Sequence, residues 1–130
     1  MNRLTRSWAA SFQRIAERAL GKETGAKLWR KYQSAFPSGY QALVSPRYAL
    51  KDSLHLERLT TPNNQSISLL KPYQETAHYR LHFYSQQERF LDDYIPVLEN
   101  MHLRVMDQVQ FPVTVDGVTQ FIRSFTIKTA

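Results

Sequence analysis

The chain has 130 residues, of which 42% are hydrophobic and 12% aromatic, and a formal net charge of +6. This composition fits one packed domain and argues against disorder. The absence of cysteine excludes disulfides, thiolate metal sites and a cysteine nucleophile, and no apolar run approaches the roughly 20 residues of a membrane helix. The four glycines lack the spacing of a phosphate or dinucleotide cradle, so we expect no complete nucleotide-dependent active site.

The positive charge is concentrated at the start of the chain. Residues 1–35 carry eight Lys and Arg against two Asp and Glu, whereas residues 36–130 carry nine of each. This distribution favours a solvated helical face or a dock for an acidic partner. The sharper alternative is a nucleic-acid patch.

The first half of the chain predicts helices. Apolar side chains recur at three- and four-residue steps on one face of a first helix, which ends at Gly21: Trp8, Phe12, Ile15, Ala16 and Leu20. A second helix is expected at about 23–35, followed by a turn at 36–40. Ser45-Pro46 then indicates the start of a third helix, because serine suits the N-cap and proline the first helical position.

The second half predicts mainly strands. A short apolar run at 67–70 is typical of a strand, and residues 79–84 alternate between apolar and polar side chains. Asp92-Asp93 indicates the start of a fourth helix, since acidic side chains suit the positive helix end. Residues 103–115 and 118–128 predict a hairpin around Asp116-Gly117.

This order of elements predicts an α+β fold. After two leading helices it reads α-β-β-α-β-β, which is the ferredoxin-like order with its last helix and strand moved to the front. We therefore expect a four-stranded antiparallel sheet with two helices on one face. The expected domains are an N-terminal helical segment, 1–40, and a ferredoxin-like domain, 41–130.

Few side chains suggest chemistry by themselves. The four histidines are scattered, so no metal site is expected. Asp92 and Asp93 predict helix capping, with a catalytic base in a free-standing enzyme as the alternative. Phe121 and Phe125 are candidates for stacking on RNA, although their strand lacks the glycines of an RNA-recognition motif.

One segment resembles a known family. Residues 95–105, Ile-Pro-Val-Leu-Glu-Asn-Met-His-Leu-Arg-Val, are similar to a segment of the large bacterial NAD-specific glutamate dehydrogenases. The resemblance extends over nearly the whole chain. Its further positions are Trp8, Leu20, Tyr32, Ala35-Phe36-Pro37, Tyr40, Ser45-Pro46-Arg47, Ala49, Asp52, Leu56-Glu57, Leu59, Arg80-Leu81 and the run 121–125.

The resemblance implies a non-catalytic, ACT-like regulatory or assembly segment, N-terminal to the catalytic domain of a longer cytoplasmic, oligomeric enzyme of amino-acid metabolism. That parent would convert L-glutamate and NAD to 2-oxoglutarate, ammonium and NADH. The expected partners are the rest of the parent chain, further copies and an allosteric amino-acid effector, with no membrane. NAD would bind the parent, so no catalytic residue and no cofactor are assigned here, and the fragment alone should be inactive. The alternative is a small basic nucleic-acid-binding module of ferredoxin-like fold.

Two departures from the family pattern concern loops. His102 stands where the family has a glycine that suits a left-handed helix end. The loop 85–90 lacks the glycine that lets ACT backbones approach a ligand carboxylate. An architectural role is therefore expected at least as much as effector binding. If an effector binds, the candidates are Gln86, Gln87, Arg89, Asp92 and Asp93, with Arg89 on its carboxylate and the aspartates on its amino group.

Overall fold

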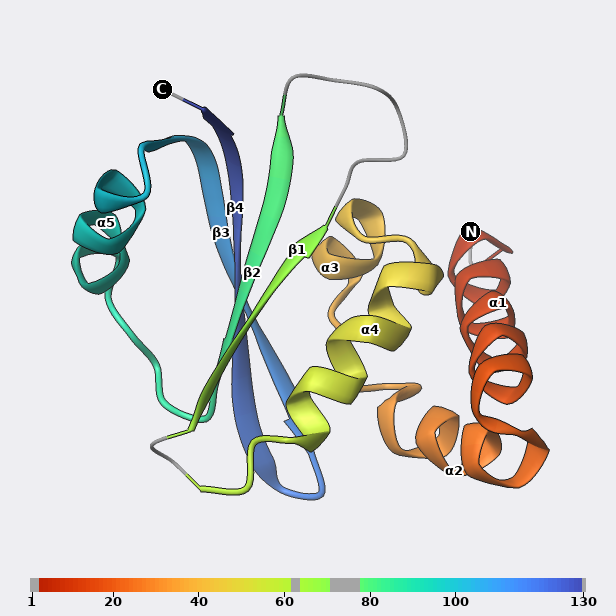
Figure 1. Ribbon diagram of the computed structural model, residues 1–130. Coiled ribbons are helices and arrows are strands. Elements are labelled where there is room, and N and C mark those ends of the chain that lie inside the picture. Colours follow the sequence, from red (N-terminus) through yellow and green to blue (C-terminus); the bar gives the residue numbers. More distant parts are fainter. Residues whose placement is uncertain (1–2, 62–63, 71–77, 130) are drawn as a thin grey trace. The chain divides into compact units, whose positions relative to one another are not determined.

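The computed structural model describes residues 3–61, 64–70 and 78–129 (Figure 1). Its contacts divide the chain into two compact units. One contains Met1–Arg58 with Pro112–Thr119, and the other contains Leu59–Phe111 with Gln120–Ala130. The expected domain boundary after residue 40 stays a prediction. None of the described helices is long and apolar enough to cross a membrane.

The first unit holds four helices, α1 (Arg3–Leu20), α2 (Lys22–Tyr32), α3 (Ser38–Leu43) and α4 (Pro46–Glu57). The predicted helices at the start of the chain and at Ser45-Pro46 are confirmed. The predicted turn at 36–40 was wrong in part, because α3 begins at Ser38. Pro37 is its N-cap in an extended conformation, and the Tyr40 hydroxyl donates to the buried Asp52 carboxylate of α4. A six-residue helix is too short to show periodicity.

Aromatic side chains form the core of this unit. Phe12, Phe36 and Tyr40 are buried, and the rings of Phe36 and Tyr40 stack at 4.4 Å. Trp8 packs edge-on against both of these rings, and its indole N–H donates to the Val44 carbonyl oxygen at 2.9 Å. Trp8 therefore packs against this aromatic cluster.

The four strands are β1 (Gln65–Leu70), β2 (Tyr79–Ser85), β3 (Leu103–Val115) and β4 (Val118–Thr129), in the sheet order β1-β2-β4-β3. The β1–β2 and β2–β4 pairs are antiparallel. Asp116 and Gly117 both have positive φ, as the expected tight hairpin between β3 and β4 requires. These elements confirm the predicted α+β class and its four-stranded antiparallel sheet.

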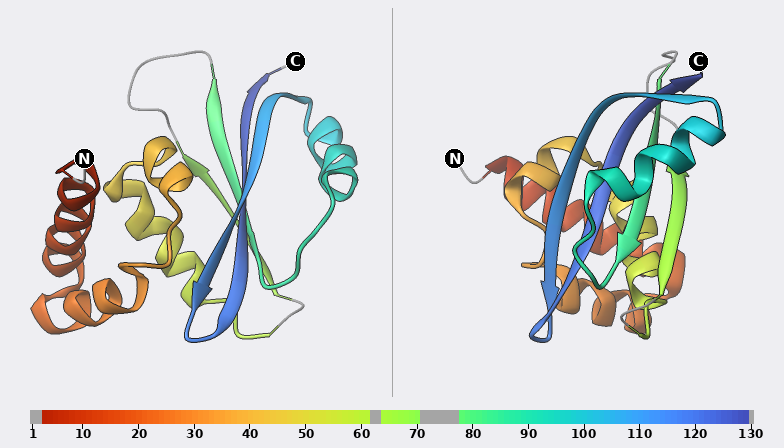
Figure 2. Two further views of the ribbon diagram at one scale, coloured as in Figure 1. Left: turned by 180° about the vertical axis from the view of Figure 1, so that it is seen from behind. Right: turned by 90° about the vertical axis from the view of Figure 1, so that its left-hand side faces the viewer.

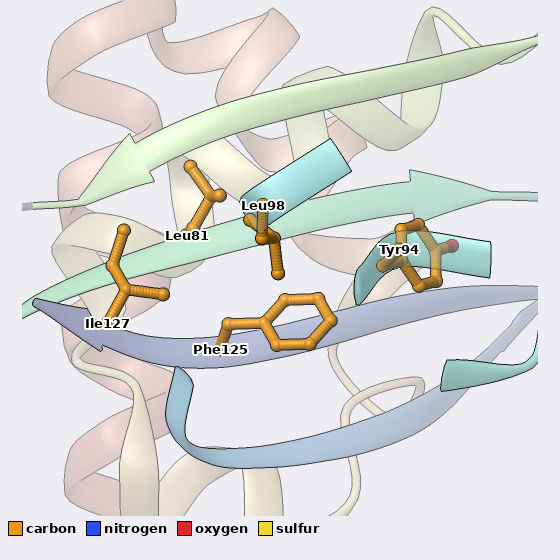
Figure 3. Packing of buried hydrophobic residues seen from close by; sticks show 5 residues of the cluster. All are labelled: Leu81, Tyr94, Leu98, Phe125 and Ile127. Atoms are coloured by element: carbon orange, nitrogen blue, oxygen red, sulfur yellow. The ribbon is translucent and has the colours of Figure 1, made fainter. Parts of the chain in front are cut away.

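Helix α5 (Leu91–Asn100) connects β2 to β3, which are separated in the sheet by β4. It packs on one face of the sheet (Figure 2). Its buried residues Tyr94 and Leu98 meet Leu81 of β2 and Phe125 and Ile127 of β4 (Figure 3). Leu81 pairs with Phe125 across the strands, so these side chains share a face. This packing fixes the β2–α5 loop at the N-terminal end of the helix.

Candidate functional site

The loop between β2 and α5 contains three of the predicted effector residues, Gln86, Gln87 and Arg89. The Gln86 side chain donates to the Leu59 carbonyl oxygen at 2.7 Å. The backbone N–H of Gln87 donates to the Ser85 hydroxyl at 3.0 Å, and the Gln87 side chain is exposed. Gln86 thus anchors the loop, whereas the Gln87 side chain is exposed to solvent.

The two aspartates at the start of α5 differ in their contacts. The Asp93 carboxylate accepts the backbone N–H of Phe90 at 3.2 Å, which is the helix-capping role expected for it. Asp92 is exposed. Among the described residues, no group of three His, Asp or Glu side chains could hold a metal ion.

Arg123 of β4 joins this site, although it is distant in sequence. It is 8% exposed, and its Nη2 donates to the Arg89 carbonyl oxygen at 2.8 Å and to the Gln110 side chain at 3.1 Å. Its Nη1 donates to the side-chain oxygen of Gln108. Arg123 of β4 therefore connects the β2–α5 loop to β3.

The ring of Tyr94 lies beside the Arg123 guanidinium. Its ring centroid is 5.7 Å from the Arg123 guanidinium carbon, within cation–π range. Burial raises the pKa of the Tyr94 hydroxyl. The guanidinium groups of Arg89 and Arg123 lower that pKa, and the Asp93 carboxylate raises it. Two predicted residues, Arg89 and Asp93, are thus brought into one electrostatic cluster with two unpredicted ones.

The sequence contained a signal for Arg123. Phe121, Arg123 and Phe125 share one face of a strand because side chains alternate. A cation between two aromatic residues on an inward face is a buried charge, which requires partners. Phe125 itself is fully buried, so the structure excludes it as a platform for RNA bases.

The other end of α5 has a shallow hollow of about 350 Å³, lined by Ile95, Leu98, Glu99, His102, Leu103, Arg104 and Val105. His102 has a φ of 59°, the left-handed conformation that the family glycine would adopt easily. The strained histidine lies where the chain turns from α5 into β3. This departure from the family pattern therefore lies at the α5–β3 connection, whereas the other one lies in the β2–α5 loop.

The described architecture is that of an ACT-like α+β protein preceded by helices. Residues 65–130 match the family profile described as "Glutamate dehydrogenase, ACT3 domain", and residues 16–59 match "Glutamate dehydrogenase, helical motif 2". The chain belongs to this glutamate dehydrogenase family.

Two curated relatives agree with this assignment. The NAD-specific glutamate dehydrogenase of Pseudomonas aeruginosa is 27% identical over 109 residues, which cover 82% of this chain. That of Halomonas elongata is 25% identical over 129 residues, or 97% of the chain. The matched regions span 7% and 8% of the length of these relatives.

Proposed function

We propose that this chain is a non-catalytic regulatory or assembly segment of a large NAD-dependent glutamate dehydrogenase. The parent would convert L-glutamate and NAD to 2-oxoglutarate, ammonium and NADH in the cytoplasm as an oligomer. The observation that carries the proposal is the match of residues 65–130 to the ACT3 domain profile. The glycine spacing supports a non-catalytic role, since none of the four glycines forms a dinucleotide cradle.

The regulatory form of the proposal places an amino-acid effector at the β2–α5 loop. Arg89 would receive the carboxylate, and the exposed Asp92 would receive the amino group. Asp93 would contribute its charge while it caps α5. Gln87 would line the mouth of the site, and Gln86 would hold the loop through Leu59.

Activity of the isolated chain tests the non-catalytic claim. We expect no NADH formation from L-glutamate and NAD above a protein-free blank, with an active glutamate dehydrogenase as the positive control. Turnover that follows the chain through purification and is lost in Asp92→Asn would contradict the proposal in favour of an enzyme.

Two measurements on the same sample, sedimentation and backbone amide shifts, separate the assembly form of the proposal from the regulatory form. An assembly segment should self-associate with increasing concentration, or bind the remaining parent chain when the two are mixed. A regulatory segment should instead respond to an amino acid through backbone amide shifts at 86–93. A chain that does neither would contradict both forms.

A further inference from the structure

Arg123 is a buried cation whose hydrogen-bond acceptors are all neutral. They are the Arg89 carbonyl oxygen and the side-chain oxygens of Gln108 and Gln110. In the described part of the chain, no carboxylate forms an ion pair with Arg123. A buried charge is costly unless it is paired, so a carboxylate is the expected partner of this guanidinium.

A second guanidinium, that of Arg89, acts on the same Tyr94 hydroxyl. The Nε–H groups of Arg89 and Arg123 are both buried, and neither has a hydrogen-bond partner among the described residues. Each Nε–H group has lost its hydrogen bond to water without gaining one in the protein, which costs free energy. Both arginines thus have an unused Nε–H donor, the Arg123 guanidinium contacts the Arg89 backbone, and no described carboxylate forms an ion pair with either side chain.

The nearby acids do not fill this role. Glu88 is exposed and lies 3.4 Å from the Gln110 side-chain nitrogen, from which it accepts a hydrogen bond. Asp93 accepts the backbone N–H of Phe90 at the start of α5. Both carboxylates are committed to other donors.

The side chains of Gln108 and Gln110 both accept hydrogen bonds from the Arg123 guanidinium. Both glutamines are partly exposed, whereas Arg123 is buried. A glutamine amide and a carboxylate have the same planar shape, but a charged acceptor makes a hydrogen bond roughly twice as strong. An incoming carboxylate could thus replace a glutamine oxygen with a gain in binding energy and no change in the buried arginine.

We propose that Arg123 is the carboxylate-binding residue of this segment, and that a small-molecule carboxylate displaces the side chain of Gln108 or Gln110 to reach it. The group would be held between Arg123 and Arg89. This inference rests on the proposed regulatory function and deepens it, because it names the chemical group that is recognised and a strand residue that recognises it.

The test uses the ¹⁵N-labelled 130-residue chain and the Nε–Hε signals of Arg89 and Arg123. The probes are acetate and L-glutamate, each compared with chloride at matched ionic strength. We expect saturable shifts of both arginine signals with at least one carboxylate and not with chloride. Absence of a saturable shift, or an equal shift with chloride, would overturn the proposal.

Gln108→Glu supplies the carboxylate from within the protein. We expect this variant to bind the responding probe at least about tenfold more weakly and to melt at a higher temperature, because Arg123 gains an ion pair. Gln65→Glu adds the same charge at an exposed position on β1 and should leave binding unchanged. Unaltered binding in Gln108→Glu would overturn the proposal.

The outcome is separable from that of the proposed function. Backbone amides at 86–93 that respond to an amino acid, while the arginine Nε–Hε signals stay fixed, would overturn the Arg123 proposal alone. The regulatory form would then stand with a different carboxylate contact.

Discussion

The Tyr32 hydroxyl is fully buried and donates to the Glu57 carboxylate at 2.7 Å, and Lys31 pairs with the same carboxylate at 2.7 Å. The hydrogen bond therefore links α2 to α4 through a charged acceptor. Tyr32→Phe removes the donor and keeps the ring. We expect a loss of about 1–2 kcal/mol in the free energy of unfolding at neutral pH, measured by urea denaturation. Wild-type stability in this variant would show that the contact contributes nothing.

The same tyrosine gives a pH dependence. Desolvation, followed by the hydrogen bond to Glu57, raises the pKa of Tyr32 far above its ordinary value. The unfolded chain loses this proton near pH ~10 while the folded chain retains it, so stability falls as the pH rises above about 10. In Tyr32→Phe, the decline in unfolding free energy between about pH 9 and 11 should be shallower. Parallel declines in the two proteins would contradict this assignment.

His102 has a strained, left-handed backbone conformation. At a φ of 59°, replacement by glycine relieves the clash of the Cβ atom but raises the entropy of the unfolded chain. We expect His102→Gly to be equal in stability to the wild type or up to about 1 kcal/mol more stable. Arg104→Gly, an exposed strand position two residues later, should instead be destabilising. A clear loss in His102→Gly would indicate that the imidazole makes a stabilising contact.

Residue-level prediction from the sequence succeeded where the role is local. Asp93 caps α5, as acidic residues at a helix start do, and Arg89 lies in the predicted loop. It missed Arg123 and Tyr94, which reach the loop only through the pairing of β4 with β2 and the packing of α5. Contacts between residues distant in sequence depend on strand order, which periodicity does not determine.

At the scale of elements, α1 and α2 approach closely at Gly25. A Cβ atom there would lie 2.4–2.5 Å from backbone atoms of Ala16 and Glu17, which is closer than any real contact. Helix propensity alone predicts that Gly25→Ala gains up to about 1 kcal/mol. We expect a loss of about 1–3 kcal/mol instead, because the two backbones must separate.

Thermal and urea denaturation of Gly25→Ala decide between these signs. Thr24→Ala, an exposed neighbour in α2, is the matched control and should stay within about 0.5 kcal/mol of the wild type. A stabilised Gly25→Ala protein would contradict the close helix crossing.

The long strands and the amphipathic helices were predictable because each repeats a period over many residues. The hairpin of β3 and β4 also carries its own turn signal at Asp116-Gly117. Helix α3 was not predictable in the same way, since its six residues follow Pro37 and include Gly39. Its stability depends on the burial of Tyr40 and on the bond from Tyr40 to Asp52, both of which are tertiary.

At the scale of the whole molecule, the basic residues of 1–35 permit a test of the nucleic-acid alternative. The buried Phe125 removes one of its two aromatic candidates. We expect no salt-dependent retardation of single-stranded RNA or duplex DNA by the chain at low ionic strength. Retardation that weakens steeply with added salt would support the nucleic-acid module instead.

The proposed regulatory or assembly role is tested most directly in a full-length glutamate dehydrogenase of this family, by replacing the segment that corresponds to residues 65–130 with a Gly/Ser linker. The native mass of the variant and its rate of NADH formation would be measured with and without each common amino acid and compared with the intact enzyme. The account predicts that NADH formation persists, while the native mass or the response to an amino acid changes. A folded variant that forms no NADH, or one identical to the intact enzyme in mass and in every response, would contradict it.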